Sequence, residues 1–247
     1  MSSIAFTRNV NLALRRLLAR GGAPDENPVE MFLAEVDWGG LSETQDQEFV
    51  FAVVPQDLGQ TPLAEFICGK DAHAIVNNIW IQAMNVTGDS DWFARNAGIV
   101  TGYCDNYLEI YQPSAFQDHR IGTIRVYDMG ALISRIWILE PLIDGRKRYS
   151  FNHFQTALRG TLEFTWRLYA HAGYPVGEVE IRSALANAED LDLWITPSVN
   201  HILPNRDVGR RLYVPKRPVV VDPHAIEAQA SDLASRIGRA LRSHYGG

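Results

Sequence analysis

One stretch of the sequence, residues 107–173, constrains the fold more than any other. Ser150 is a favourable helix N-cap, and apolar and aromatic side chains then recur every three or four residues over 151–172. Gly173 fits the left-handed position that ends many helices, and Pro175 cannot extend the helix. This pattern predicts a long amphipathic helix with a wide buried face, which needs a sheet to pack against.

The segments before this helix have the composition of β-strands. Residues 122–127 and 131–139 are rich in β-branched and aromatic side chains, and the Asp-Met-Gly at 128–130 suits a short hairpin connection. Residues 107–112 form a third predicted strand. We expect the helix to cover these strands, because a few strands alone cannot bury their apolar face.

The C-terminal part of the chain predicts shorter strands and a second long helix. Asp222 is the expected N-cap of this helix and Pro223 its first residue, which gives a helix over 223–244. Alternating apolar and charged residues predict a half-buried strand, followed by its antiparallel partner. Two short edge strands come next. The ranges of these four strands are 179–182, 191–195, 211–214 and 218–221.

The N-terminal part predicts a helix over residues 7–20, in which every charged side chain is arginine. Two interpretations stay open, a docked amphipathic helix and an arm that binds a partner or nucleic acid. We expect a helical arm over 1–24 and a single α+β domain over 25–247, with an internal boundary near 100–106 as an alternative. The predicted fold is a mainly antiparallel sheet covered by the two long helices.

Residues 29–38 and 48–55 are predicted as strands joined by a polar loop, and a helix is expected over 71–84 with a further helical turn at 91–97. No Lys or Arg occurs between Gly21 and Gly69. Ten acidic residues lie there: Asp25, Glu26, Glu30, Glu35, Asp37, Glu43, Asp46, Glu48, Asp57 and Glu65. Such a run indicates a solvated acidic face or a surface for a basic partner.

Composition favours a cytoplasmic protein. The chain of 247 residues has only two cysteines, Cys68 and Cys104, which are expected to be free thiols in a reducing compartment. No secretory leader and no apolar run long enough for a membrane span is recognisable, so no membrane association is expected. The net charge of −6 gives no global attraction to nucleic acid.

Two groups of residues are candidates for catalysis. Cys68 lies where a strand is expected to give way to a helix, with His73 nearby as a base for a thiol nucleophile. Asp37 and Glu48 fall on or near two predicted strands, where carboxylates could hold the metal of a nuclease. Phosphate-loop, dinucleotide, nucleophile-elbow and zinc spacings are missing from the sequence. No metal site and no cofactor is therefore predicted.

Basic residues gather in two segments that could bind nucleic acid or an acidic partner. Tyr213 lies within the second segment and could stack on a base. Solvated loops are the alternative interpretation. The residues are Arg146, Lys147, Arg148, Arg206, Arg210, Arg211, Lys216 and Arg217.

Several features recur in one order over residues 124–245. They are Val126-Tyr-Asp-Met-Gly130, the strand with Trp137, Phe164-Thr-Trp166 with Leu168, Val179-Glu-Ile-Arg182, Asp232-Leu-Ala and Tyr245-Gly246. In this order the region resembles the C-terminal part of bacterial Schlafen-like, Alba-type proteins, which are thought to bind DNA. The Glu-Phe-Lys and Asn-Thr-x-Gly-Gly motifs of their DNA-binding module are absent from this sequence. The resemblance therefore implies a bacterial accessory domain and carries over no DNA-binding residue.

These observations predict a non-catalytic accessory or interaction module, in a nucleic-acid-handling or defence-type assembly. The expected partner is another protein or a second copy of the chain. The alternatives are direct nucleic-acid binding through the basic loops and a hydrolase such as a metal-dependent nuclease.

Overall fold

The computed structural model describes most of the chain between residues 28 and 246. The predicted arm over 1–24, its helix over 7–20 and the helical turn at 91–97 lie outside the described residues. The described ranges are 28–35, 47–58, 60–87, 100–104, 107–113, 120–137, 147–196, 201–204, 209 and 211–246.

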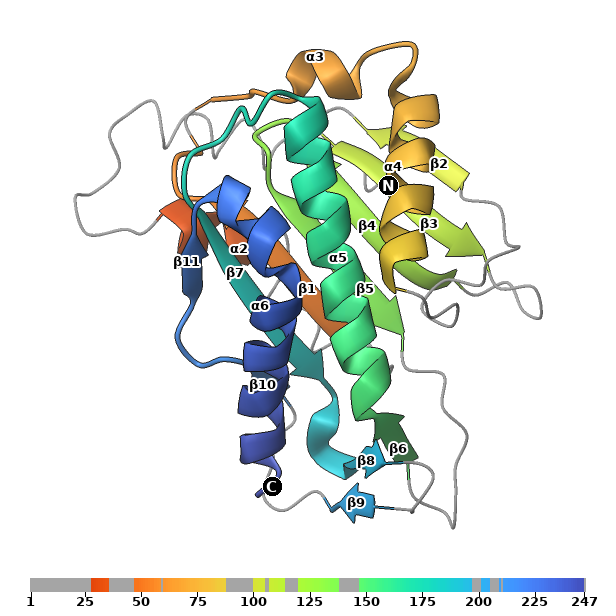
Figure 1. Cartoon of the computed structure of the whole chain (residues 1–247), viewed down its shortest axis with the longest axis vertical. Coiled ribbons are helices and arrows are strands. Elements are labelled where there is room, and N and C mark those ends of the chain that lie inside the picture. Colours follow the sequence, from red (N-terminus) through yellow and green to blue (C-terminus); the bar gives the residue numbers. More distant parts are fainter. Residues whose placement is uncertain are drawn as a thin grey trace.

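The described residues form an α+β fold around an eight-stranded sheet in which all pairs are antiparallel (Figure 1). The spatial order is β10-β7-β1-β5-β4-β3-β2, and β11 also pairs with β7. The predicted α+β class with a mainly antiparallel sheet is confirmed. The strands are β1 (Glu48–Pro55), β2 (Val100–Cys104), β3 (Tyr107–Pro113), β4 (Arg120–Tyr127), β5 (Leu132–Trp137), β7 (Val179–Ala186), β10 (Arg211–Tyr213) and β11 (Val219–Val221).

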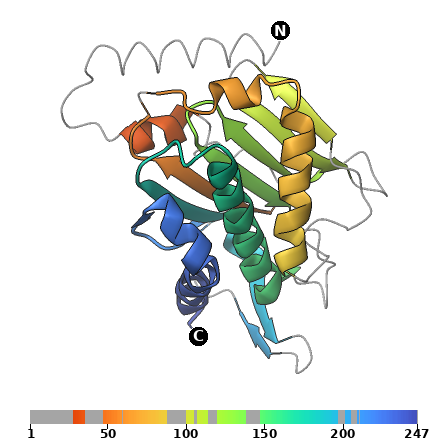
Figure 2. The same cartoon turned by 45° about the horizontal axis from the view of Figure 1, so that its top comes forward.

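Three helices cover one face of this sheet, α4 (Ala72–Thr87), α5 (Phe151–His171) and α6 (Pro223–His244), as Figures 1 and 2 show. Two covering helices were expected, and α4 is the third. The caps are as predicted, because Ser150 accepts a hydrogen bond from the His153 amide and Asp222 accepts one from the His224 amide. Gly173 has the left-handed φ of +76° expected after a helix.

The helices α5 and α6 approach each other closely at Gly238. A Cβ atom at this position would lie 2.8 Å from Gln155 Nε2 and 3.2 Å from Phe151 Cζ. Glycine therefore allows the backbone of α6 to contact the side chains of α5. A larger residue at this position would push the two helices apart. This contact sets how closely α6 packs against α5.

The central strand β1 is buried on both faces, as its almost continuous apolar run suggests. On the helix side, Phe49 and Phe51 pack against Phe154, with ring centroids 4.7 and 5.6 Å apart. On the opposite side, Val50 and Ala52 belong to a second apolar cluster.

The second cluster is covered by a helix, α2 (Pro28–Glu35), so the predicted strand over 29–38 is wrong in this part. Val29, Phe32 and Leu33 supply the apolar face of α2 and are all buried. Their spacing of three and four residues is helical, but a short apolar run does not distinguish a strand from a helix by periodicity. Burial against the sheet decides between the two.

A small second sheet lies beyond the end of β7 and corrects another prediction. Residues 191–195 belong to β8 (Leu191–Thr196), which pairs in parallel with β6 (Lys147–Ser150) and antiparallel with β9 (His201–Leu203). They do not pair with 179–182, because η2 (Ala188–Asp190) turns the chain away after β7. The strand β7 is accordingly an interior strand between β1 and the edge strands, rather than half-buried.

The remaining described helix is α3 (Ala64–Ile67). None of the helices in the described ranges combines the length and the apolar character that crossing a membrane requires.

Candidate anion-binding pocket at the sheet edge

An interruption in the edge of the sheet creates the candidate site. The outer side of β7 pairs with β11 over residues 179–181 and with β10 over 184–186. Arg182 and Ser183 lie between these two stretches and pair with neither edge strand. Only the Val214 amide continues the ladder there, donating to the Ser183 carbonyl at 2.9 Å. Pro215 and Pro218 have no amide hydrogen, so this connection cannot continue as a regular strand.

A pocket of about 570 Å³ opens at this interruption, and we call it the edge pocket. Its volume is within the range of small-molecule sites, about 300–1,000 Å³. The lining residues come from α2, β7, β10, the connection between β10 and β11, and the end of α6. The polar and charged side chains among them are Glu30, Arg182, Ser183, Arg211, Tyr213, Lys216 and His244.

Strand register explains why side chains distant in the sequence meet here. Directly opposed residues of an antiparallel pair point to the same face. Arg182 is opposite Ala52, while Arg211 and Tyr213 are opposite Ala186 and Ala184. All three of these alanines belong to the apolar cluster under α2. The two arginines and Tyr213 therefore lie on the α2 face of the sheet.

Arg182 is held by two carboxylates. It donates through Nε to Glu180 and through Nη2 to Glu30 of α2 at 2.6 Å. Burial by itself lowers the pKa of the Arg182 guanidinium, but the contacts with these two acids outweigh it and raise the pKa above its ordinary value. Arg182 thus links β7 to α2 and is a neutralised cation in the pocket wall.

Arg211 and Tyr213 form a second unit. The Arg211 Nη1 atom donates to the Tyr213 hydroxyl oxygen at 3.1 Å, and its Cζ atom lies 5.7 Å from the centre of the Tyr213 ring. Tyr213 is 40% exposed, which is high for a large aromatic residue. A guanidinium and an accessible ring are thus presented together at the pocket.

The far wall is provided by His244 and Lys216. Burial lowers the pKa of His244, and the nearby positive charge of Lys216 lowers it further. His244 therefore favours its neutral form more strongly than an ordinary histidine does. An anion near both groups would favour the protonated form of His244 and so oppose this lowering of its pKa.

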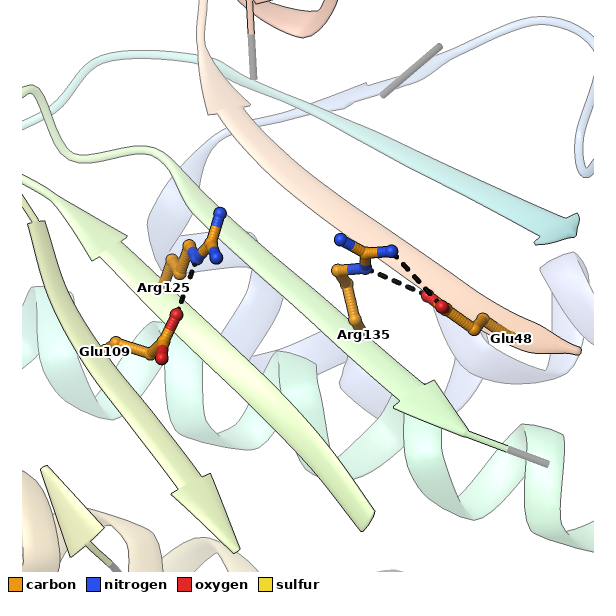
Figure 3. Close-up of polar contacts among 4 residues, drawn as sticks. All are labelled: Glu48, Glu109, Arg125 and Arg135. Atoms are coloured by element: carbon orange, nitrogen blue, oxygen red, sulfur yellow. Dashed lines mark hydrogen bonds and ion pairs between the residues drawn. The ribbon is translucent and has the colours of Figure 1, made fainter. Parts of the chain in front are cut away.

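A separate set of charges, the ion-pair band, lies on the same sheet face and consists of Glu48, Glu109, Arg125 and Arg135 (Figure 3). Arg125 on β4 donates to Glu109 on β3 at 2.8 Å. Arg135 on β5 donates to both carboxylate oxygens of Glu48 on β1, at 2.9 and 3.2 Å. Each arginine is thus matched to one acid on a neighbouring strand.

The burial of Glu48 bears on the nuclease hypothesis, since its side chain is fully buried. Its two oxygens are both engaged by Arg135, and this arrangement fastens β1 to β5. Asp37 lies outside the described residues. Within the described ranges, no three His, Cys, Asp or Glu side chains gather in a way that could hold a metal ion.

The residues of the predicted thiol site lie at the surface, where α3 ends and α4 begins. Cys68 is exposed at the C-cap of α3. His73 is the second residue of α4 and is also exposed. Neither residue lines the edge pocket.

Part of the predicted basic segment does come together. Arg211, Tyr213 and Lys216 line the edge pocket, whereas Arg217 is exposed beside it. Arg206 and Arg210 lie outside the described residues, as does Arg146.

The other predicted basic segment is elsewhere, on the second sheet. Lys147 is exposed on β6. Arg148 is buried directly opposite Asp192 in the parallel pair of β6 and β8. Neither residue lines the edge pocket.

Glu30, Arg182 and His244 of the pocket were not among the predicted site residues. The sequence contains one partial signal for Arg182. The alternation of apolar and charged residues in β7 puts Arg182 on the same side of the strand as its partner Glu180. Glu30 is 152 positions from its partner Arg182, so their contact follows only from the packing of α2 on the sheet.

Comparison of this chain with known protein families, with curated proteins and with solved structures finds no significant match.

Proposed function

We propose that this protein is a non-catalytic interaction module that binds an anionic group of its partner in the edge pocket. The observation that carries this proposal is the charge of the lining. Arg182 in the lining is held by Glu30 and Glu180, and two more cationic side chains, Arg211 and Lys216, line the pocket without a further carboxylate in the lining. A pocket with surplus positive charge attracts carboxylates and phosphates.

The positions of the other charged groups support a binding role over a catalytic one. The carboxylates of the ion-pair band are committed to arginines on adjacent strands. We therefore assign Glu48 a role in holding β1 to β5 and no role in a reaction. Arg211 and Lys216 lie at the edge of the sheet, where a partner can reach them.

Direct nucleic-acid binding is the second candidate function, and the exposure of Tyr213 favours it. A base can stack on an accessible tyrosine ring, while Arg211 and Lys216 contact phosphate. The resemblance to bacterial Schlafen-like, Alba-type proteins agrees with a place in a nucleic-acid-handling or defence-type assembly, and it stays a prediction.

Fluorescence anisotropy tests the proposal with four labelled probes, an acidic peptide, single-stranded DNA, duplex DNA and RNA. Each is measured at about 50 mM and about 200 mM salt, because phosphate contacts weaken steeply over this range. We expect at least one probe to bind, and Arg211→Ala/Lys216→Ala to weaken it about tenfold or more. Tightest binding to the acidic peptide indicates a protein partner, and tightest binding to a nucleic acid indicates the second candidate.

The matched control is Lys70→Ala/Arg236→Ala. It removes the same net charge at two exposed positions outside the pocket lining. Equal weakening by the two double variants would show general attraction to the surface and contradict the pocket. Failure of every probe to bind at low salt would contradict the proposed function itself.

A further inference from the structure

We infer that the group bound in the edge pocket is a 5′-phosphorylated ribonucleoside, either free or at the end of an RNA strand. This inference rests on the proposed function and specifies its ligand. It follows from four kinds of side chain that line one pocket, namely cations, one carboxylate, one accessible aromatic ring and one histidine.

The cations Arg211 and Lys216 provide the phosphate site. Arginine presents its donors in a planar fork that fits phosphate oxygens, and lysine adds a compact positive charge. Arg182 is the weaker candidate because Glu180 and Glu30 already hold its guanidinium. A phosphate near Lys216 would also offset the effect of this positive charge on the pKa of His244.

The carboxylate of Glu30 indicates that the ligand is not a simple anion. An anion alone would be repelled by this group, whereas a ligand that carries hydroxyl donors as well as a phosphate can bind both the carboxylate and the cations of the pocket. One Glu30 oxygen accepts from Arg182, and a carboxylate has about four lone-pair sites in total. Acidic side chains accept hydrogen bonds from ribose hydroxyls in other nucleotide sites.

The ring of Tyr213 supplies the third requirement. It is accessible and is linked to Arg211 by a 3.1 Å hydrogen bond, so the stacking surface and the phosphate site are adjacent. Stacking of a base on an aromatic ring contributes about 1–3 kcal/mol and tolerates different bases. The pocket of about 570 Å³ is larger than a phosphate alone would need.

Isothermal titration calorimetry of the full chain with adenosine 5′-monophosphate tests this inference, and the cytidine, guanosine and uridine monophosphates extend it to the other bases. Three truncated ligands remove one feature each, adenosine, ribose 5-phosphate and 2′,3′-dideoxyadenosine 5′-monophosphate. We expect each to bind about tenfold more weakly than the complete nucleotide, because each lacks the phosphate contact, the stacking or the hydroxyl contact.

The variant Glu30→Leu, which removes both the charge and the hydrogen-bond acceptors of Glu30, separates the hydroxyl contact from general electrostatics. It removes a negative charge, so simple attraction predicts tighter binding of every phosphate. The inference predicts that the ratio of affinities for adenosine 5′-monophosphate and its dideoxy analogue falls from about tenfold towards one. An unchanged ratio would overturn the assignment of Glu30.

The source of the phosphate is decided with an eight-nucleotide RNA that carries either a 5′-phosphate or a 5′-hydroxyl. Preference for the 5′-phosphate strand over the free nucleotide indicates a strand end, and the reverse indicates a free nucleotide. Both outcomes support the inference.

Two results would overturn the inference. The first is binding of adenosine 5′-monophosphate no tighter than that of inorganic phosphate. The second is pocket-dependent binding of RNA or acidic peptide that the nucleotide does not displace. In the second case the proposed function would stand, whereas loss of all pocket-dependent binding would remove both.

Discussion

The edge pocket and the ion-pair band lie on one face of the same sheet and use the same residue types, yet their charges are balanced differently. In the ion-pair band each arginine has its own glutamate on an adjacent strand. In the edge pocket Arg182 is held by Glu30 and Glu180, while Arg211 and Lys216 line the same pocket without a further carboxylate in the lining.

The difference follows from position in the sheet. Interior strands bring opposed side chains into fixed register, so a charge there must be paired where it stands, because an isolated buried charge is costly. An edge with an interrupted ladder allows surplus charge to remain near solvent. Charges in the interior thus serve stability, and those at the edge are available for binding.

The largest effect on stability is expected from Glu48→Ala. It removes the only carboxylate that is seen to hold Arg135 in the described structure and leaves that guanidinium in a mostly buried position. The free energy of unfolding should fall by about 3 kcal/mol, as measured by urea denaturation followed by circular dichroism.

Two comparisons make the Glu48 prediction specific. Glu48→Leu/Arg135→Leu should recover most of the loss, because it removes both charges at once. The pocket variant Arg211→Ala/Lys216→Ala should change the free energy of unfolding by less than about 1 kcal/mol. Equal destabilisation by the pocket variant and by Glu48→Ala would show that the charges of the edge pocket contribute as much to stability as those of the ion-pair band.

A smaller effect is expected from Glu109→Gln. Its partner Arg125 is 31% exposed, so solvent screens this pair more than the pair of Glu48 and Arg135. Burial alone lowers the pKa of Arg125, but Tyr127 and Glu109 outweigh it and raise the pKa. The free energy of unfolding should fall by about 1 kcal/mol. The exposed Glu65→Gln is the control and should show no measurable change. If Glu109→Gln destabilised the protein as much as Glu48→Ala does, the expected dependence of the ion-pair contribution on burial would be contradicted.

The smallest effect concerns the pH dependence of the pocket wall. Because the pKa of His244 is lowered in the folded state, the unfolded chain binds more protons at mildly acidic pH. The contribution of His244 to stability is therefore complete above its ordinary pKa of about 6.5 and is lost as the pH falls through its lower folded value.

Thermal unfolding of the wild type and of His244→Gln between about pH 7.5 and pH 5 measures this contribution. The wild type should lose slightly more stability than the variant as the pH falls. A variant that loses as much stability as the wild type would show that folding does not lower the pKa of His244.

Local sequence signals were sufficient for the elements whose ends are set by neighbouring residues. Ser150, Gly173 and Asp222 mark the ends of α5 and the start of α6 because capping acts within one turn of a helix. The hairpin of β4 and β5 follows from the short connection at residues 128–130, which leaves little choice of pairing partner.

The sequence did not predict the elements whose form depends on distant partners. The strand predicted over 29–38 is helical as α2 up to Glu35, because the sheet offers an apolar surface for Phe32 and Leu33. The strand at 191–195 pairs with β6 rather than with β7, because the outer side of β7 is taken by β10 and β11.

The candidate site shows the same division. Arg211, Tyr213 and Lys216 lie close together along the chain, and local patterns predict the helices α5 and α6 and most strands of the large sheet. Strand pairing and helix packing bring Glu30, Arg182 and His244 to the same pocket, and no local pattern predicts this. The physical reason is that periodicity and capping act over a few residues, whereas a pocket at a sheet edge is made by strand pairing and helix packing between distant segments.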